Sequence, residues 1–203
     1  MLVKEKFYRL NLKTKIFFSI KIFLIYLLFI NFAYADLQKN LINKLIETKT
    51  LSFDFKQKIA NKVESGNCFI KYPLKMKCNY QNIKKKVIIS NGKTVAVIKK
   101  KYKKIYRYSI KSTPLFTLLK KENILELIKN NEPSNINKNI VEFEFIGKKS
   151  KKIKIFFDRK TFVLSGWETI DAYSNSVSFI ISDVKINHQI GDDFFKIPLE
   201  KNL

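Results

Sequence analysis

Residues 66–80 read GNCFIKYPLKMKCNY and hold both cysteines of the chain. Apolar and polar residues alternate on either side of Tyr72-Pro73-Leu74, and this pattern predicts two antiparallel strands joined by a turn. The face that carries Cys68 and Cys78, opposite each other, also carries Gly66, Ile70, Met76 and Tyr80. Lys71, Lys75 and Lys77 lie on the other face. We therefore predict a hairpin with an apolar inner wall and a basic outer surface.

Two interpretations of the cysteine pair stay open. Cys68 and Cys78 form a disulfide if the compartment is oxidising, and otherwise they are two small core residues. We expect no metal site, because two thiolates without further ligands cannot complete a zinc shell.

The same alternation recurs along the chain. Leu51, Phe53 and Phe55 share one face, with Asp54 and Lys56 on the other. Similar runs are VIIS (87–90), VEFEF (141–145), KIKIFF (152–157) and SVSFIIS (176–182). About ten short strands, separated by turns such as Asn91-Gly92, predict a large antiparallel sheet.

Helical spacing appears in three places. Leu41 and Leu45 predict an amphipathic helix that begins at residue 36. Thr113 and Pro114 are typical of an N-cap followed by proline at the first helical position, and they open a helix at 115–121. Residues 122–131 predict a third helix. The expected order is one helix, about six strands, two short helices and about five strands.

Residues 1–35 are typical of a secretory signal peptide. A basic start is followed by an apolar run and by Ala33-Tyr34-Ala35, an A-x-A cleavage site. We expect cleavage after Ala35, which leaves residues 36–203 as one soluble, exported domain. An uncleaved anchor that starts near Ile16 is the alternative.

The formal net charge of +23 first suggests nucleic acid as a partner. Only Arg9, Arg107 and Arg159 are arginines, whereas base readers favour the arginine fork. We therefore expect no nucleic-acid partner and interpret the lysines as a solvated face.

We also expect no catalytic residue and no cofactor. His188 is the only histidine of the sequence and has no nucleophile motif near it, and the chain has no glycine-rich phosphate loop. His188 is interpreted as a surface residue.

The chain resembles the periplasmic outer-membrane lipoprotein carrier family, LolA, over nearly the whole expected mature length. The resemblance begins at Phe53-Asp-Phe55-Lys-Gln57 and continues through Gly66 to Pro73. Four further segments are similar to family motifs in the family's order: ISNGKT (89–94), TPLF (113–116), Gly166-Trp167 to Asp171, and DFFKIP (193–198).

The resemblance implies an α+β, mainly β fold. It is an incomplete, curved antiparallel barrel of about eleven strands, capped by an N-terminal helix and two short central helices around a hydrophobic cavity. The residues alone leave open whether the surplus apolar faces fill a core or enclose such a cavity. The candidate cavity residues are Leu51, Phe53, Phe55, Cys68, Ile70, Met76, Tyr80, Ile89, Leu115, Leu118, Leu119, Val141, Phe143, Phe145, Ile155, Phe157, Val177, Phe179 and Ile181.

The implied function is that of a monomeric periplasmic carrier for the acyl chains of outer-membrane lipoproteins. Its implied partners are an inner-membrane lipoprotein-releasing ABC transporter and, if present, an outer-membrane acceptor. The family usually has arginine before the hairpin proline, where it fastens the lid. Here the residue is Tyr72, a candidate latch without a guanidinium fork. A lipid or protein sensor on the same fold, and a structural β-protein with a filled core, are the alternatives.

Overall fold

The computed structural model describes residues 17, 19, 36–81, 85–146, 152–171 and 174–203. Contacts divide the chain into two units, Met1–Asn40 and Leu41–Leu203. In the first unit, residues 17, 19 and 36–40 are helical. The expected signal peptide lies almost entirely outside the described residues. No helix within the described ranges is long and apolar enough to cross a membrane.

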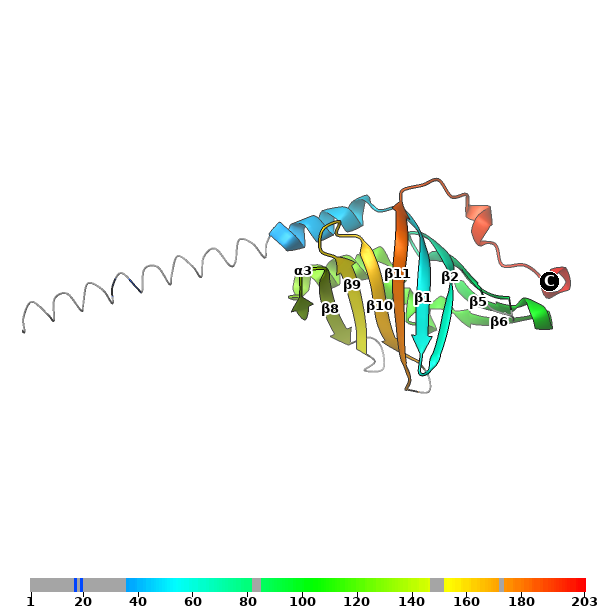
Figure 1. The fold of residues 1–203 in the computed structure, drawn as a ribbon. Helices are drawn as coiled ribbons and strands as arrows, with labels where there is room; N and C mark the ends of the chain where they lie inside the picture. The colour runs from blue at the N-terminus through cyan, green and yellow to red at the C-terminus, as the bar shows by residue number, and fades with distance from the viewer. Residues whose placement is uncertain (1–16, 18, 20–35, 82–84, 147–151, 172–173) are drawn as a thin grey trace, which may run out of the picture. The chain divides into compact units, whose positions relative to one another are not determined.

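Within the described ranges of the second unit, eleven strands form one antiparallel sheet (Figure 1). The first six are β1 (Thr50–Ile59), β2 (Lys62–Lys71), β3 (Lys75–Tyr80), β4 (Lys86–Asn91), β5 (Thr94–Lys99) and β6 (Lys104–Ser109). The others are β7 (Asn135–Ile136), β8 (Ile140–Ile146), β9 (Lys152–Asp158), β10 (Leu164–Ile170) and β11 (Ser176–Ile186).

The strand order is β6-β5-β4-β3-β2-β1-β11-β10-β9-β8-β7. Strands that follow one another in the chain are neighbours in the sheet, except β6 and β7, which lie at opposite edges. The pairing of β1 with β11 joins the two halves. In the described part of the chain β6 and β7 remain the free edges, so the sheet is not closed into a barrel. The predicted incomplete barrel of about eleven strands is confirmed.

Among the described residues of the second unit, three helices accompany the sheet. Residues 41–47 are helical, and α2 (Leu115–Leu119) and α3 (Lys121–Asn130) separate β6 from β7. The predicted element order is therefore confirmed. The predicted capping is wrong: Pro114 is the N-cap of α2, and the Thr113 hydroxyl donates back to the Ile110 carbonyl (2.9 Å). The Thr113 amide donates to the same carbonyl (3.0 Å) and closes the short 3-10 helix η2 (Ile110–Ser112).

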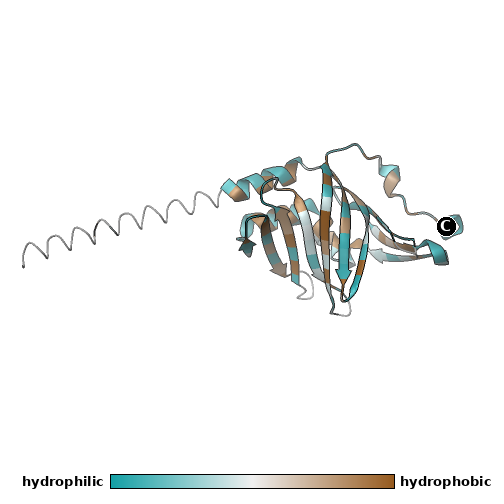
Figure 2. Cartoon of the chain, in the orientation of Figure 1, coloured by the Kyte–Doolittle hydropathy of each residue, from teal (hydrophilic) through white to brown (hydrophobic). Residues whose placement is uncertain are grey.

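Alternating hydropathy along the strands gives the sheet two distinct faces (Figure 2). On β1, Phe53 and Phe55 are buried, whereas Asp54 and Lys56 are exposed. We call the face that packs against α2 the inner face and the opposite one the outer face.

The C-terminal residues 187–203 cover part of the outer face. They include two 3-10 helices, η4 (Asp192–Phe195) and η5 (Glu200–Asn202). Ile197 and Leu203 pack against an outer-face cluster of Val87, Ile89, Ala96, Ile98 and Ile105. The basic outer surface predicted for the hairpin is thus partly covered, because Asp192 forms ion pairs with Lys71 and Lys75 (both 2.7 Å).

Candidate functional site

An apolar cavity of about 180 Å³ lies between α2 and the inner face of the sheet. The side chains that line it come from α2, from Pro114 directly before α2, and from β1, β3, β4, β10 and β11. The lining residues are Gln57, Met76, Cys78, Tyr80, Ile88, Pro114, Leu115, Leu118, Trp167, Thr169, Val177 and Phe179. Most of these side chains are apolar, so the cavity offers contact surface and few directional bonds.

A row of aromatic rings builds the inner face beside this cavity. Phe179 stacks on Trp167 (4.2 Å between centroids) and on Phe55 (4.5 Å). Phe55 also contacts Tyr80 edge-on at 4.9 Å. The row therefore runs across five strands, from β3 to β10, and forms a rigid wall.

Gly66 makes this row possible. It lies on β2 between Phe55 of β1 and Tyr80 of β3. A Cβ at Gly66 would collide with the Asn79 carbonyl oxygen and would come within 2.9 Å of the Phe55 ring. The missing side chain thus lets the two rings meet across an intervening strand.

Charged groups stand beside Tyr80, at the rim of the cavity. The Tyr80 hydroxyl donates to Gln57 Oε1 (2.9 Å), and Lys86 Nζ lies 3.7 Å from the centroid of its ring. Lys86 also forms an ion pair with Glu64. Burial, and to a lesser degree the Glu64 charge, raises the pKa of the Tyr80 hydroxyl, which therefore stays neutral at ordinary pH.

A disulfide joins Cys68 to Cys78 across β2 and β3, with 4.1 Å between their Cα atoms. Both residues are fully buried in the inner face, and Cys78 lines the cavity. The cross-link therefore fixes two neighbouring strands of the cavity wall to each other.

The structure brings together only part of the set that the sequence suggested. Met76, Tyr80, Leu115, Leu118, Val177 and Phe179 line the cavity. Eleven others are buried but are not among its lining residues: Leu51, Phe53, Phe55, Cys68, Ile70, Leu119, Val141, Phe143, Ile155, Phe157 and Ile181.

The structure places Ile89 outside the cavity, which corrects the prediction that it lines it. It pairs with Lys77 and belongs to the outer-face cluster beneath Ile197 and Leu203. Ile88, which pairs with Cys78, is the cavity residue of β4. In VIIS both isoleucines are apolar, so hydropathy alone left the phase of this strand ambiguous.

Sequence reasoning also missed Gln57, Ile88, Pro114, Trp167 and Thr169 as lining residues, and it put Cys78 on the inner wall of the hairpin without placing it among the cavity residues. Gln57, Pro114 and Trp167 lie within segments that carried the family resemblance, which was the available signal. Thr169 lies in the same segment as Trp167 and in phase with it on β10, but its polar side chain does not mark it as a lining residue.

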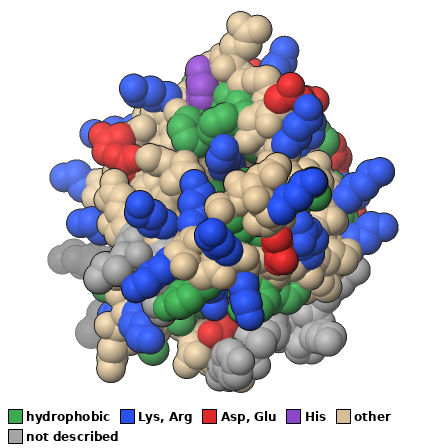
Figure 3. All heavy atoms as spheres, turned by 90° about the vertical axis from the view of Figure 1, so that its right-hand side faces the viewer, with side chains coloured by type: hydrophobic (Ala, Val, Ile, Leu, Met, Phe, Trp, Pro, Cys, Tyr) green, Lys and Arg blue, Asp and Glu red, His purple; other side chains and the backbone are tan. Residues whose placement is uncertain are grey.

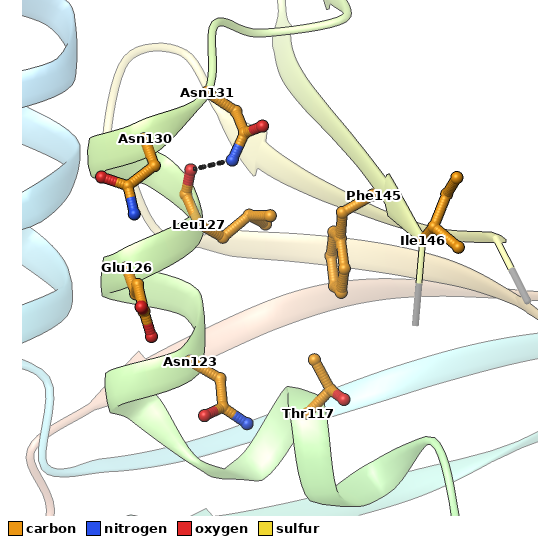
Figure 4. Close-up of a pocket in the computed structure, with 8 residues that line it drawn as sticks. All are labelled: Thr117, Asn123, Glu126, Leu127, Asn130, Asn131, Phe145 and Ile146. Atoms are coloured by element: carbon orange, nitrogen blue, oxygen red, sulfur yellow. Dashed lines mark hydrogen bonds between the residues drawn. The ribbon is translucent and has the colours of Figure 1, made fainter. Parts of the chain in front are cut away.

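Phe145 lies at a different hollow. About 320 Å³ of space separates α2 and α3 from the end of β8 (Figure 4). Asn123, Glu126, Asn130 and Asn131 line its helical side, and Leu127 points toward Phe145. Asn131 Nδ2 donates to the Leu127 carbonyl (2.9 Å). Because amides and a carboxylate supply much of this lining, the hollow lacks the apolar wall that a hydrocarbon chain requires.

Three segments converge at Tyr72, where the β2–β3 turn meets the helices. Lys121 Nζ, at the start of α3, lies 5.2 Å from the centroid of the Tyr72 ring and donates to the Ile46 carbonyl (3.1 Å). The Leu74 amide of the turn donates to the Leu119 carbonyl at the end of α2 (2.9 Å). Burial lowers the pKa of Lys121 and raises that of Tyr72.

His188 is not the surface residue that the sequence suggested. It is half-buried, and its ring lies edge-on to Phe69 (6.4 Å). Both of its nitrogens are buried, with no hydrogen-bond partner among the residues that the structure describes. Among the described residues no three His, Cys, Asp or Glu side chains gather into a group that could hold a metal ion.

Comparison with known proteins places these features in a family. The family model described as outer membrane lipoprotein carrier protein LolA matches residues 47–198. No curated protein matches the chain at a significant level.

Solved structures show distant likenesses. A LolA superfamily protein from Nitrosomonas europaea is 9% identical over 81% of this chain and 97% of its own, with a TM-score of 0.45. The MucA/MucB complex of Pseudomonas aeruginosa gives 9% identity over 83% and 62%, with a TM-score of 0.44. The lipoprotein LppX of Mycobacterium tuberculosis gives 13% over 79% and 98%, with a TM-score of 0.43. These TM-scores are too low to carry an argument, so the family rests on the sequence match.

Proposed function

This chain belongs to the outer membrane lipoprotein carrier protein LolA family, and we propose that it is a periplasmic carrier that shields the acyl chains of lipoproteins. The proposal rests on one observation above all: the apolar cavity under α2, lined by side chains such as Leu118, Val177 and Phe179. Burying one methylene contributes about 0.8 kcal/mol, so a triacylated protein needs such a cover to cross water.

In the proposed cycle the conformation described above, with α2 packed over the inner face, is the closed one. The cavity of about 180 Å³ is smaller than the roughly 300–1,000 Å³ typical of small-molecule sites. Acyl chains therefore require α2 and α3 to move away from the inner face. Leu118, Leu119, Ile124 and Ile128, which these helices bury, would then contact the lipid instead of the sheet.

We call α2 and α3 the lid. The lid is proposed to be held closed at the place where Tyr72, Lys121 and Ile46 meet. One amine binds a carbonyl and an aromatic face, and one backbone bond joins Leu74 to Leu119. Few bonds of this kind hold α2 and α3 in place while leaving the opening reversible. Tyr72 thus contributes a ring face in place of the guanidinium of an arginine.

The remaining assignments follow from the same proposal. Residues 1–35 direct export and residues 36–203 form the monomeric carrier. Cargo arrives from an inner-membrane ABC transporter and passes to the outer membrane, with or without a separate acceptor. Direction comes from the difference in affinity between partners, so the carrier needs no nucleotide and no catalytic group of its own.

A cavity-filling substitution tests the proposal. Val177→Phe adds a ring within the cavity, whereas Ile180→Phe on the same strand points to the outer face, where Ile180 is 61% exposed. We expect Val177→Phe to weaken binding of a fluorescent fatty acid by about tenfold or more, and Ile180→Phe to leave it unchanged. Equal binding by the parent protein and both variants would show that the cavity is not the site that binds the fatty acid.

A further inference from the structure

Residues 99–111, KKKYKKIYRYSIK, form a segment that the proposed function does not use. They hold seven basic residues, three tyrosines and no acid. The segment spans the end of β5, η1 (Lys100–Tyr102), β6 and the start of η2, so it follows the free edge of the sheet. We call it the basic edge.

The side chains of the basic edge are turned to solvent. Tyr102, Tyr106 and Tyr108 are 51%, 41% and 50% exposed, and the lysines at 100, 101, 103 and 104 are exposed as well. Buried Ile105 and Ile110 anchor the segment. The view onto this end of the molecule shows Lys and Arg side chains spread over the surface, with few acidic ones (Figure 3).

The positive charge of this segment is not neutralised within the described part of the chain. None of its seven basic side chains takes part in a described ion pair, and Arg107 donates only to the Pro198 carbonyl (3.2 Å). The Glu200 carboxylate reaches the edge but accepts the Ile105 amide (2.9 Å). Burial is the main cause that lowers the pKa of Lys77, and the positive charge of Lys100 lowers it further. The second effect is expected where several positive charges lie close together.

The chemistry of the basic edge fits an anionic lipid surface better than another macromolecule. Lysine clusters are attracted to anionic headgroups, and exposed tyrosines lie at the level of the headgroups. A β-strand partner is disfavoured because Glu200 already occupies the outward amide of Ile105. Base readout is disfavoured because Arg107 is the one arginine of the segment. We propose that the basic edge docks the protein on membranes rich in anionic phospholipid.

Vesicle binding tests this proposal without any cargo, so its outcome is independent of the carrier function. The chain is expressed and processed in a Gram-negative host, which gives every variant the same N-terminus. Binding is measured to vesicles of phosphatidylcholine mixed with phosphatidylglycerol, and to phosphatidylcholine alone. The test variant changes Lys100, Lys101, Lys103 and Lys104 to Gln. We expect it to bind mixed vesicles at least about tenfold more weakly.

The matched control changes the same number of exposed lysines far from the edge. Lys56 and Lys58 on β1, Lys62 at the start of β2 and Lys138 between β7 and β8 serve this purpose, since β3, β4 and β5 separate even β2 from β6. We expect the control to bind as the parent does, and raising the salt well above about 0.1 M to weaken parent binding. A third variant, with Tyr102, Tyr106 and Tyr108 changed to Ser, should weaken binding even at high salt.

Three results would overturn the proposal. Equal losses in the test and control variants would assign the effect to net charge alone. Equal binding to the mixed vesicles and to vesicles of phosphatidylcholine alone would show that the protein does not recognise anionic lipid. Duplex DNA bound as tightly as the mixed vesicles, with the tyrosine variant unaffected, would identify a general polyanion surface instead.

Discussion

Gly66 illustrates how one missing side chain shapes the candidate site. Its position between Phe55 and Tyr80 lets two rings meet across β2. Overpacking of a buried position typically costs about 1–3 kcal/mol. We expect Gly66→Ala to lower the free energy of unfolding by that amount, measured by denaturant titration.

Gly191 provides the control for this substitution. It has φ −68° and no heavy atom within 4 Å of a built Cβ, so alanine meets neither strain nor a clash. Gly191→Ala should change the free energy of unfolding by less than about 0.5 kcal/mol. A Gly66→Ala protein as stable as the parent would show that the ring row tolerates a side chain.

At the residue level the sequence predicts well which side chains are buried, and predicts poorly which face of the sheet they lie on. Phe53, Phe55 and Phe143 alternate with polar neighbours, and all three are buried. Ile88 and Ile89 are both apolar, and only the pairing of Ile88 with Cys78 decides which of them meets the cavity. Where hydropathy does not alternate, the phase comes from long-range pairing, which the local sequence does not contain.

At the level of elements, the junction between the β2–β3 turn and α3 carries a second prediction. Lys121→Gln removes the positive charge over the Tyr72 ring and weakens the bond to the Ile46 carbonyl. We expect faster amide exchange throughout α2 and α3 and faster uptake of a fluorescent fatty acid, with little change in global stability. Both are measured on the same samples.

Lys138→Gln is the control for the lid, because Lys138 is exposed in the loop between β7 and β8. It should exchange and bind as the parent does. If Lys121→Gln also matched the parent in both measurements, Lys121 would have no part in holding the lid.

The C-terminal segment carries a third prediction, which concerns pH. Ion pairs with Lys71 and Lys75 lower the pKa of Asp192 to about 2 from an ordinary value near 3.9. The ionised carboxylate therefore stabilises the folded segment fully above about pH 4, and that contribution is lost as pH falls toward 2. We expect protection of residues 190–197 against hydrogen exchange to fall across this range.

Asp192→Asn should remove that step and lower the protection at neutral pH. Asp193→Asn is the matched control, because Asp193 pairs only with Lys196 on the exposed side of the same turn. Identical pH profiles for the parent and Asp192→Asn would show that the ion pairs with Lys71 and Lys75 do not hold the segment.

The elements differ in how far the sequence predicts them. Turn residues such as Asn91-Gly92 and alternating strands predict the strand count and the antiparallel pairing of successive strands. The pairing of β1 with β11, which joins the two halves, has no such local signal. The apolar residues of 187–203 follow neither the helical nor the strand spacing. Nothing in the local sequence predicts that Ile197 and Leu203 cover Val87, Ile89 and Ala96. The capping of α2 was mispredicted because Thr113 bonds backward to Ile110 and not forward into the helix.

For the molecule as a whole, the choice between a filled core and a cavity depends on summed side-chain volumes. Composition could not decide it, because the same apolar residues serve either purpose. The aromatic row from Tyr80 to Trp167 builds a rigid wall, and α2 covers it without filling the space of about 180 Å³. This is the feature on which the carrier account depends.

Native mass spectrometry with lipid analysis, on protein purified from its own cell envelope, tests that account most directly. The parent protein and Ile180→Phe are predicted to carry acylated lipoprotein in stoichiometric amount, and Val177→Phe to carry little or none. Protein that is always empty, in cells that make abundant lipoprotein, would contradict the carrier function and favour a sensor or a structural role on the same fold.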